Sequence, residues 1–246
     1  MGNIAALVIS PMYRRQGIGA ALHTAAIDRL RARGVHRVQL GGGDRRFWPG
    51  VPTNLPDART FWERKGWTWD HAVADLTRDL RALLDGASYL HTAAEHGWRI
   101  DVAASSDVAD LLAFEAREFP EWHAAFAQVI ALGDTHDCLI ARDAAGDVIG
   151  SLVLYSATSY PDRTDVIWQG LLGDGLGALG AVGVAAARQG QGIGSAMVAR
   201  GGQILQQRGA TIAFVGWVWA IDFYRRLGYD VWRTYQMSHR ELDRMV

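Results

Sequence analysis

A strand, a glycine-rich turn and an Ala- and Leu-rich helix occur in this order twice along the chain, with Gly17 and Gly192 lying 175 positions apart. The first copy leads from an apolar segment at residues 4–9 into Arg14-Arg15-Gln16-Gly17-Ile18-Gly19. The second leads from residues 179–184 into Gln189-Gly190-Gln191-Gly192-Ile193-Gly194. Glycines permit a tight turn, so its N–H groups and the N-terminus of the next helix converge on one point. Each copy is therefore expected to bind an anion, and a phosphate-bearing cofactor is the natural ligand.

Each copy ends in a second shared motif, a short helix that closes on a glycine. It follows another predicted strand, at residues 35–40 and 211–215. The pattern Ala-x-x-Phe-aromatic-x-x-x-Gly-aromatic begins at Ala58 and again at Ala220. The glycine is placed as a helix C-cap. The first copy has a longer loop before this helix, which contains Gly41, Gly42, Gly43, Pro49, Pro52 and Pro56.

The two motifs together resemble the GNAT superfamily of acetyl-CoA-dependent N-acetyltransferases. That family combines (Gln or Arg)-x-x-Gly-x-Gly after a strand with Ala-x-x-Phe-Tyr-x-x-x-Gly-aromatic further on. The resemblance covers nearly the whole chain and implies an α/β fold (an α+β mixed sheet) in tandem GNAT-like modules. It implies a partial module at residues 1–85, a linker at 86–97 and a complete acetyltransferase domain at 98–246.

Composition excludes several other classes of protein. The chain has 246 residues, 49% of them hydrophobic and 21% charged, as in a soluble globular protein. A net charge of −1 without a basic run argues against nucleic-acid binding. The lone Cys138 excludes a disulfide framework and a cysteine metal cluster, and we expect it to be a small apolar strand residue. The apolar N-terminal segment is too short to span a membrane. We therefore expect a cytoplasmic protein with no metal, no membrane contact and no nucleic-acid partner.

The second module is predicted to be complete. The pattern indicates a strand at 98–102, helices at Val108–Glu118 and 121–132, and a hairpin of strands Cys138–Arg142 and Val148–Tyr155. With the motif segments this gives the order β-α-α-β-β-β-α-β-α-β, which is that of a whole GNAT domain. We expect residues 97–246 to fold alone.

The first module is predicted to be incomplete, because Met1 lies where the family plan begins its fourth strand. Either the start is internal to a longer gene, or half a module persists as a fused fragment. Its motif strand then has an unpaired apolar edge. We expect this half to pack against the C-terminal module or to form a homodimer with a second copy of itself. A linker helix around Leu80, Leu83, Leu84 and Leu90 would be interrupted by Gly86.

By position, the resemblance implies an acetyl-CoA site in the second module, with the pyrophosphate on residues 189–195 and the pantetheine arm on 182–184. These residues are Val182, Gly183, Val184, Gln189, Gly190, Gln191, Gly192, Ile193, Gly194 and Ser195. The corresponding first-module residues are 7–9 for the arm and, for the phosphates, Arg14, Arg15, Gln16, Gly17, Ile18, Gly19 and Ala20. Arg14 and Arg15 either contact phosphates or form a solvated loop end.

Acetyl transfer needs a proton donor for the departing thiolate and a proton acceptor for the amine. The resemblance implies that Tyr224 protonates the thiolate; the alternative is an aromatic that only supports its helix. The first module has Trp62 at this place, and an indole N–H is not a useful acid. A general base is not assigned, since the motif strands carry no carboxylate. The alternatives are a water chain or one of Glu115, Glu118, Glu121, Asp174 and His123, which are otherwise a solvated polar face.

Trp217 and Trp219 stand where the family often has an asparagine that contacts the pantetheine. We expect them to share one strand face, packed in the core or forming an aromatic wall for the acceptor.

The leading hypothesis is an N-acetyltransferase that moves an acetyl group from acetyl-CoA to a primary amine of a small molecule or peptide, by direct attack in the C-terminal module. The alternative is a non-catalytic acyl-CoA-binding or regulatory protein. A dinucleotide-dependent oxidoreductase fits less well. Its Gly-x-Gly-x-x-Gly fingerprint is broken by Ser195, and no acidic residue ends the strand at 211–215.

Overall fold

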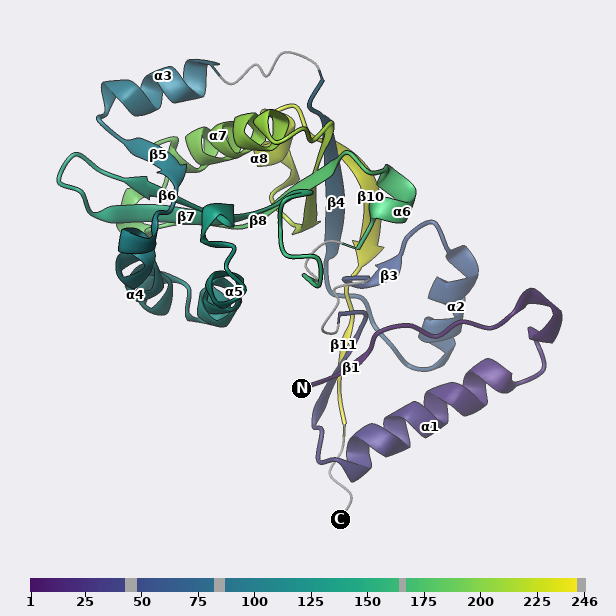
Figure 1. Ribbon diagram of the computed structural model, residues 1–246. Helices are drawn as coiled ribbons and strands as arrows, with labels where there is room; N and C mark the ends of the chain where they lie inside the picture. The colour runs from purple at the N-terminus through teal and green to yellow at the C-terminus, as the bar shows by residue number, and fades with distance from the viewer. Residues whose placement is uncertain (43–47, 82–86, 164–166, 243–246) are drawn as a thin grey trace. The chain divides into compact units, whose positions relative to one another are not determined.

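The computed structural model describes residues 1–42, 48–81, 87–163 and 167–242, and the chain forms two compact units (Figure 1). The first unit comprises Met1–Asp75, Trp217–Trp219 and Trp232–Val246, and the second comprises Leu76–Gly216 and Ala220–Val231. Both units are discontinuous in sequence. The predicted modules at 1–85 and 98–246 are contiguous, so they do not coincide with these units.

The second unit contains a mixed sheet. Its strands are β5 (Arg99–Val102), β6 (Cys138–Arg142), β7 (Val148–Tyr155), β8 (Leu176–Val184) and β9 (Ile212–Val218). Neighbours from β5 to β8 pair antiparallel, whereas β8 and β9 pair parallel because helix α7 connects them. The mixed sheet expected from the sequence is confirmed.

Helices cover both faces of this sheet. The elements are α3 (Ala87–Glu95), α4 (Val108–Glu118), α5 (Pro120–Ala131), α6 (Gln169–Leu172), α7 (Ile193–Gln207) and α8 (Ile221–Arg225). Figure 1 shows α3 and α7 on one face and α4 and α5 on the other. The predicted bounds of α4, β6 and β7 are confirmed. Residues of the expected linker form α3, which packs against α7; Leu83, Leu84 and Gly86 lie outside the described residues.

The first unit contains a parallel pair of strands, β1 (Gly2–Ile4) and β2 (Arg37–Leu40), with α1 (Ile18–Ala32) between them. The C-terminal strand β11 (His239–Glu241) pairs antiparallel with the other edge of β2. Helix α2 (Pro56–Arg64) follows, and a hydrophobic core forms around these elements. Its buried members are Ile4, Ile27, Val38, Leu40, Val51, Trp62, Trp67 and Leu242.

The strand predicted at residues 4–9 is wrong in extent, because β1 ends at Ile4. In the second copy, β7 pairs with the segment that corresponds to residues 5–9. Among the described residues nothing pairs with 5–9 as a strand, and the side chain of Val8 is 73% exposed. Strand β1 itself is the edge strand of its three-stranded sheet, so the unpaired edge expected for the motif strand is present over Gly2–Ile4.

Three further strands complete the hydrogen-bonded order β3-β10-β4-β9-β8-β7-β6-β5. They are β3 (Val51–Pro52), β4 (Ala72–Asp79) and β10 (Asp230–Gln236). Strand β4, from the first half of the sequence, lies between β9 and β10, from the second half. Its residues up to Asp75 belong to the first unit and those from Leu76 to the second. Strand β3 occupies part of the predicted proline-containing loop, whose Gly43 lies outside the described residues.

No helix in the described parts of the chain is long and apolar enough to cross a lipid bilayer.

The two sequence copies have the same local structure with a constant offset (193 minus 18, or 175). Helices α1 and α7 each have 15 residues and are each preceded by a 3-10 turn, Pro11–Tyr13 or Ala186–Arg188. The strand registers also coincide, since Gly2 pairs with Val38 and Gly177 pairs with Ala213. A Cβ atom at Gly2 would lie 2.8 Å from Leu30, and one at Gly177 would lie 3.0 Å from the equivalent Leu205. Both strands therefore need glycine where the helix presses against them.

The closing helices repeat in the same way. In α2 the Phe61 and Trp62 rings meet edge to face at 5.1 Å, and in α8 Phe223 and Tyr224 do so at 4.8 Å. The predicted C-cap glycines, Gly66 and Gly228, have φ of +78° and +77°. The repeat seen in the sequence thus extends to side-chain packing.

Candidate functional site

Strands β8 and β9 diverge in the second unit. They pair only at Leu176–Ile212, Gly177–Ala213 and Ala178–Phe214, although each strand continues well beyond these pairs. On its other side β8 stays paired with β7 as far as Gly150–Val184. The edge of β8 that faces away from β7 over residues 179–184 therefore carries backbone groups that β9 does not use. Such an edge can pair with an extended ligand.

A β-bulge lies in the middle of this edge. The register changes from Ser151–Gly183 to Val153–Gly180, so two residues of β8, Ala181 and Val182, oppose one residue of β7. Ala181 has a φ of +48°. The bulge lies in the part of β8 that no longer pairs with β9. The sequence gives no signal for it, because an alanine at positive φ looks like any other strand residue.

The end of β8 leads into the predicted phosphate loop. Gly190 and Gly192 have φ of +77° and +94°, and Gly192 is the N-cap of α7 without a capping side chain. Within the described chain, the backbone N–H groups of residues 190–195 have no hydrogen-bond acceptor. The Gln189 Nε2 donates to the Val184 carbonyl at 3.2 Å, which joins the loop to the strand. Free N–H groups at the start of a long helix form an anion site.

The first copy has the same loop with one substitution. Gly17 caps α1 at a φ of +82°, and Arg14 Nε donates to the Ile9 carbonyl at 3.1 Å, as Gln189 does to Val184. Arg15 stands in place of Gly190 and keeps the left-handed backbone at a φ of +64°. This conformation costs a non-glycine residue about 1 kcal/mol. The exposed Arg15 guanidinium has no ion-pair partner among residues that the structure describes, so it is open to an anion.

Tyr224 lies in α8 and is 8% exposed. Its ring meets Phe223 and Tyr229 edge to face, and Phe223 approaches within 3.6 Å of the Cβ position of Gly194. Tyr224 therefore sits on the helix that packs against the phosphate loop. Burial raises the pKa of Tyr224 to about 12, so its phenol keeps its proton at neutral pH.

Glu115 of α4 is not on a solvated face, contrary to the favoured expectation. It is 0% exposed, and its Oε1 accepts a hydrogen bond from the Ser151 hydroxyl. Its Oε2 is buried and has no partner among the described atoms. Burial, with a smaller contribution from the negative charge of Glu121, raises the pKa of Glu115 to about 7.

The other proposed bases differ from Glu115. Glu118 accepts hydrogen bonds from Arg117 and from the Ala186 N–H, which hold its pKa below the usual range. Glu121 is exposed and His123 is half-buried. Asp174 is also exposed and precedes β8, at the opposite end of the strand from Val184.

Glu115→Gln is expected to remove a pH dependence of stability. The folded-state pKa of Glu115 lies above its ordinary 4.5, so the protonated side chain favours folding and this contribution is lost as pH rises through about 7. A shift of this size corresponds to about 3 kcal/mol in the free energy of unfolding between pH 4.5 and pH 8. Urea titrations at several pH values should show a flatter profile for Glu115→Gln between pH 4.5 and pH 8. Over the same range the profile should be unchanged for the partly exposed Glu118→Gln, because the lowered pKa of Glu118 affects stability only at lower pH. A profile unaltered by Glu115→Gln would contradict the assignment.

The tryptophan tract differs from the expectation. Strand β9 ends at Val218, so Trp219 lies beyond it and is 81% exposed, and Trp217 has a φ of +61°. The two rings therefore do not share one strand face. The backbone N–H of Trp217 donates to the buried Asp75 carboxylate, which also accepts from the Tyr235 hydroxyl, and both contacts lie in the first unit.

Asp134, His136 and Asp137 bring metal-ligating atoms within 4.8 Å of one another. Arg163 and Arg208 bind the two oxygens of the buried Asp137 at 2.5 Å and 2.6 Å. We read the cluster as an ion-pair network, because its central carboxylate already has two cationic partners. Cys138 beside it is buried, and its pKa is raised to about 12, as expected of a small apolar residue.

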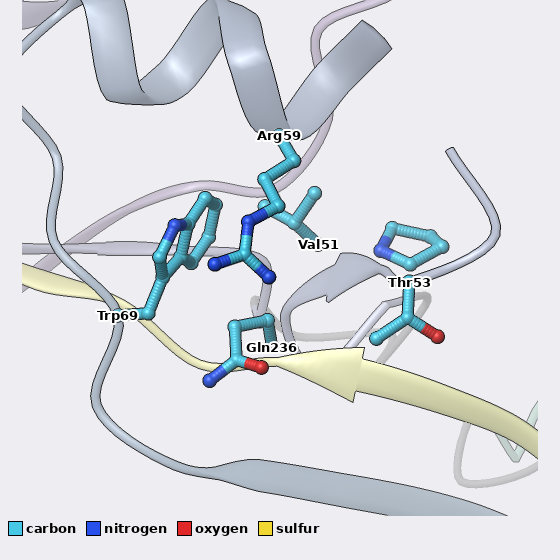
Figure 2. A pocket seen from close by; sticks show the side chains of 6 residues that line it. Val51, Thr53, Arg59, Trp69 and Gln236 are labelled. Carbon is cyan, nitrogen blue, oxygen red and sulfur yellow. The ribbon is translucent and has the colours of Figure 1, made fainter. Parts of the chain in front are cut away.

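A small recess lies in the first unit (Figure 2). Its lining residues are Val51, Pro52, Thr53, Arg59, Trp69 and Gln236. The Arg59 guanidinium lies over the Trp69 ring at 5.6 Å and binds Glu63 at 2.9 Å. The recess has a volume of about 40 Å³, which holds a few water molecules but not the pantetheine arm of a cofactor.

Comparison with known proteins agrees with this geometry. The family model described as Acetyltransferase (GNAT) family matches residues 1–48 and 106–229. The chain is 36% identical to the solved GCN5-related glucosamine N-acetyltransferase region of a fungal multi-domain GH3 beta-N-acetylglucosaminidase, with a TM-score of 0.89. The alignment covers 97% of this chain and 29% of that one. No curated protein sequence matches the chain.

Two further solved structures share the fold at lower identity. A GCN5-related N-acetyltransferase from Sphaerobacter thermophilus is 17% identical with a TM-score of 0.69, and the alignment covers 95% of this chain and 70% of that one. A tandem GNAT protein from the clavulanic acid biosynthesis pathway is 16% identical with a TM-score of 0.62, with coverage of 97% and 74%. The family model spans well over half of the residues, including the β8–loop–α7 site, and on this basis the chain belongs to the GNAT acetyltransferase family.

Proposed function

We propose that the chain transfers an acetyl group from acetyl-CoA to a primary amine, and that this occurs in the second unit. The observation that carries the proposal is the continuity of the divergent edge of β8 with the uncapped N-terminus of α7. An extended pantetheine arm can pair with residues 182–184, and its pyrophosphate then reaches the free N–H groups of residues 190–195. A donor held at both ends presents its thioester carbonyl in a fixed place, which is what direct attack by an amine requires.

The proposed acceptor is the amino group of a glucosamine-type sugar. The likeness to the fungal glucosamine N-acetyltransferase region supports this choice over a peptide N-terminus. Thiol release from acetyl-CoA should be measured with glucosamine, with N-acetylglucosamine as the blocked control and with a short peptide. Release with glucosamine alone supports the proposal. Release only with the peptide would contradict the acceptor, and no release with any amine would contradict the activity.

Tyr224→Phe is expected to lower kcat roughly 10- to 100-fold and to leave the affinity for acetyl-CoA nearly unchanged, because only the proposed proton donor is lost. Tyr229→Phe is the matched control. Its hydroxyl is buried without a partner among the described residues, so its removal should not alter kcat. Steady-state kinetics and calorimetry measure the two effects. An unaltered kcat in Tyr224→Phe would make this residue a structural aromatic.

The first unit is proposed to have a non-catalytic role, as an acyl-CoA-binding loop or as a scaffold. Its phosphate loop is intact, from Arg14 to Ala20, with Arg15 open to an anion. However, Trp62 replaces the proposed acid, and residues 7–9 are not part of a strand. Pairing of the exposed edge at residues 5–9 with a second copy of the chain stays a prediction, which sedimentation equilibrium would test.

A further inference from the structure

We propose that Glu115 is the proton acceptor for the attacking amine, and that the amine approaches β8 from the face covered by α4 and α5. This inference rests on the proposed acetyl transfer and names the base that the sequence does not assign. It is carried by the position of one buried carboxylate relative to the bulge in β8.

The Glu115 carboxyl group lies beside the donor segment through Ser151. Ser151 donates to Glu115, and its backbone is the register partner of Gly183, a residue of the proposed pantetheine segment. Directly opposed residues in an antiparallel pair have Cα atoms about 5 Å apart. The bulge at Ala181 lies between this pair and the next one, Val153–Gly180. Glu115 thus lies beside the part of β8 that no longer pairs with β9.

On the same face of β8, a glycine allows the segment after α4 to pack close to the strand. A Cβ atom at Gly183 would lie 2.5 Å from the ring of Phe119, which follows α4 directly. The α4–α5 junction therefore approaches the backbone of the donor segment closely. Helix α4 brings Glu115 to this face one helical turn before Phe119.

One oxygen of Glu115 is available for a proton. Oε1 accepts from Ser151, but Oε2 is buried and has no hydrogen-bond partner in the described part of the chain. A buried carboxylate oxygen without a partner is costly, and a donor from a bound substrate would satisfy it. No other carboxylate considered as a base combines burial with a free oxygen.

The electrostatic surroundings suit proton acceptance near neutral pH. From α5, Glu121 raises the pKa of Glu115, and from β7 the Ser151 hydroxyl lowers it. From β6, the Cys138 thiol stays neutral because its pKa is about 12, and β8 contributes no titratable side chain. A base with a pKa near the working pH is the efficient one.

The proposed step is balanced. The neutral amine nitrogen forms a bond to the thioester carbonyl carbon, and the C–S bond breaks. The proton that leaves the nitrogen goes to Glu115, and the departing thiolate takes the proton of Tyr224. Exchange with solvent then restores both side chains.

The test is the pH dependence of kcat for acetylation of glucosamine in four proteins. The kcat of the wild-type protein should fall as the pH drops below the value at which Glu115 ionises. In Glu115→Gln, kcat should be about 100-fold lower and should no longer fall at acidic pH, whereas the affinity for acetyl-CoA should be unchanged. Ser151→Ala removes a hydrogen bond that favours the ionised form of Glu115, so the midpoint of its kcat–pH curve should move to higher pH. Glu121→Gln removes a negative charge near Glu115, so the midpoint of its curve should move to lower pH, with the same maximal kcat as the wild type.

Opposite shifts of one midpoint are not expected from residues that only hold the fold. An active wild type with an unaltered profile in Glu115→Gln, or equal midpoints in all the variants, would overturn the assignment alone. A wild type that binds acetyl-CoA but acetylates no amine would overturn the proposed function and this assignment together. If Ser151→Ala fails to fold, the comparison of Glu115→Gln with Glu121→Gln still decides.

Discussion

Neither half of the chain is expected to fold when it is produced alone, with the break between residues 85 and 97. A fragment of residues 1–85 lacks β11, which pairs with β2, and it lacks Leu242 of its hydrophobic core. A fragment of residues 97–246 lacks β4, which lies between β9 and β10. The sequence alone predicts that residues 97–246 fold by themselves, and the position of β4 leads us to predict the opposite.

The size of the effect follows from the buried side chains of β4. Val73, Ala74 and Leu76 are each at most 5% exposed. Burial of a Val or Leu side chain contributes about 1.5–3 kcal/mol, and loss of a central strand also leaves two edges unpaired. Domains have a total stability of only about 5–15 kcal/mol, so removal of β4 is expected to be decisive.

Circular dichroism melts of each fragment and of their equimolar mixture provide the measurement. We expect no cooperative transition for either fragment and recovery of one in the mixture, where β4 and β11 can reach their partners. Binding of acetyl-CoA should return only in the mixture. A monomeric 97–246 fragment that melts cooperatively and binds acetyl-CoA would show that β4 is dispensable.

Gly192→Val is expected to weaken acetyl-CoA binding by about 1–3 kcal/mol, or roughly 5- to 150-fold, with the fold retained. A Cβ atom at Gly192 meets nothing within 4 Å, so the substitution fits the free protein sterically. The residue must nevertheless adopt a φ near +94°, which a β-branched side chain resists. The loop N–H groups then turn away, and the side chain lies where the pyrophosphate approaches.

Gly17→Val is the matched control, because Gly17 also caps a 15-residue helix at positive φ and also has open space around it. Calorimetry of both variants separates the two loops. If only the second loop holds the donor, Gly17→Val should bind acetyl-CoA as the wild type does. A loss of one binding equivalent in Gly17→Val would show that the first loop is also a site. Unchanged affinity in a folded Gly192→Val variant would contradict the assignment.

Local patterns in the sequence were sufficient for much of the second unit. The alternation in Cys138–Arg142 and Val148–Tyr155, with a glycine-containing turn between them, specifies a hairpin without reference to the rest of the chain. The two glycine-rich turns likewise specify a strand–turn–helix unit, and its register is repeated at Gly2–Val38 and Gly177–Ala213. In each case the turn or helix that joins the paired segments is itself recognisable in the sequence.

Pairings between distant segments could not be predicted in this way. Nothing in Ala72–Asp79 indicates that its neighbours are β9 and β10. The apolar pattern of a strand predicts which face is buried, but it does not predict which strands pair with it. The burial of Glu115 was missed for a related reason. A glutamate on a predicted helix looks solvated until the helix face that meets β7 is known, and the Ser151 hydroxyl that binds it lies 36 positions away.

The pairing of β2 with β11 also determines when the first unit can finish folding during synthesis. Val38 leaves the ribosome about 200 residues before its partner Arg240, which at about 5–20 residues per second is a delay of roughly 10–40 s. During that time β2 has one free edge, and the apolar residues that β11 and Leu242 later cover are accessible to other nascent chains. The second half of the sequence therefore leaves the ribosome while the sheet of the first unit still lacks β11. We therefore expect the first unit to be completed only after β11 and Leu242 have left the ribosome. A chaperone that protects strand edges should raise the yield of native protein.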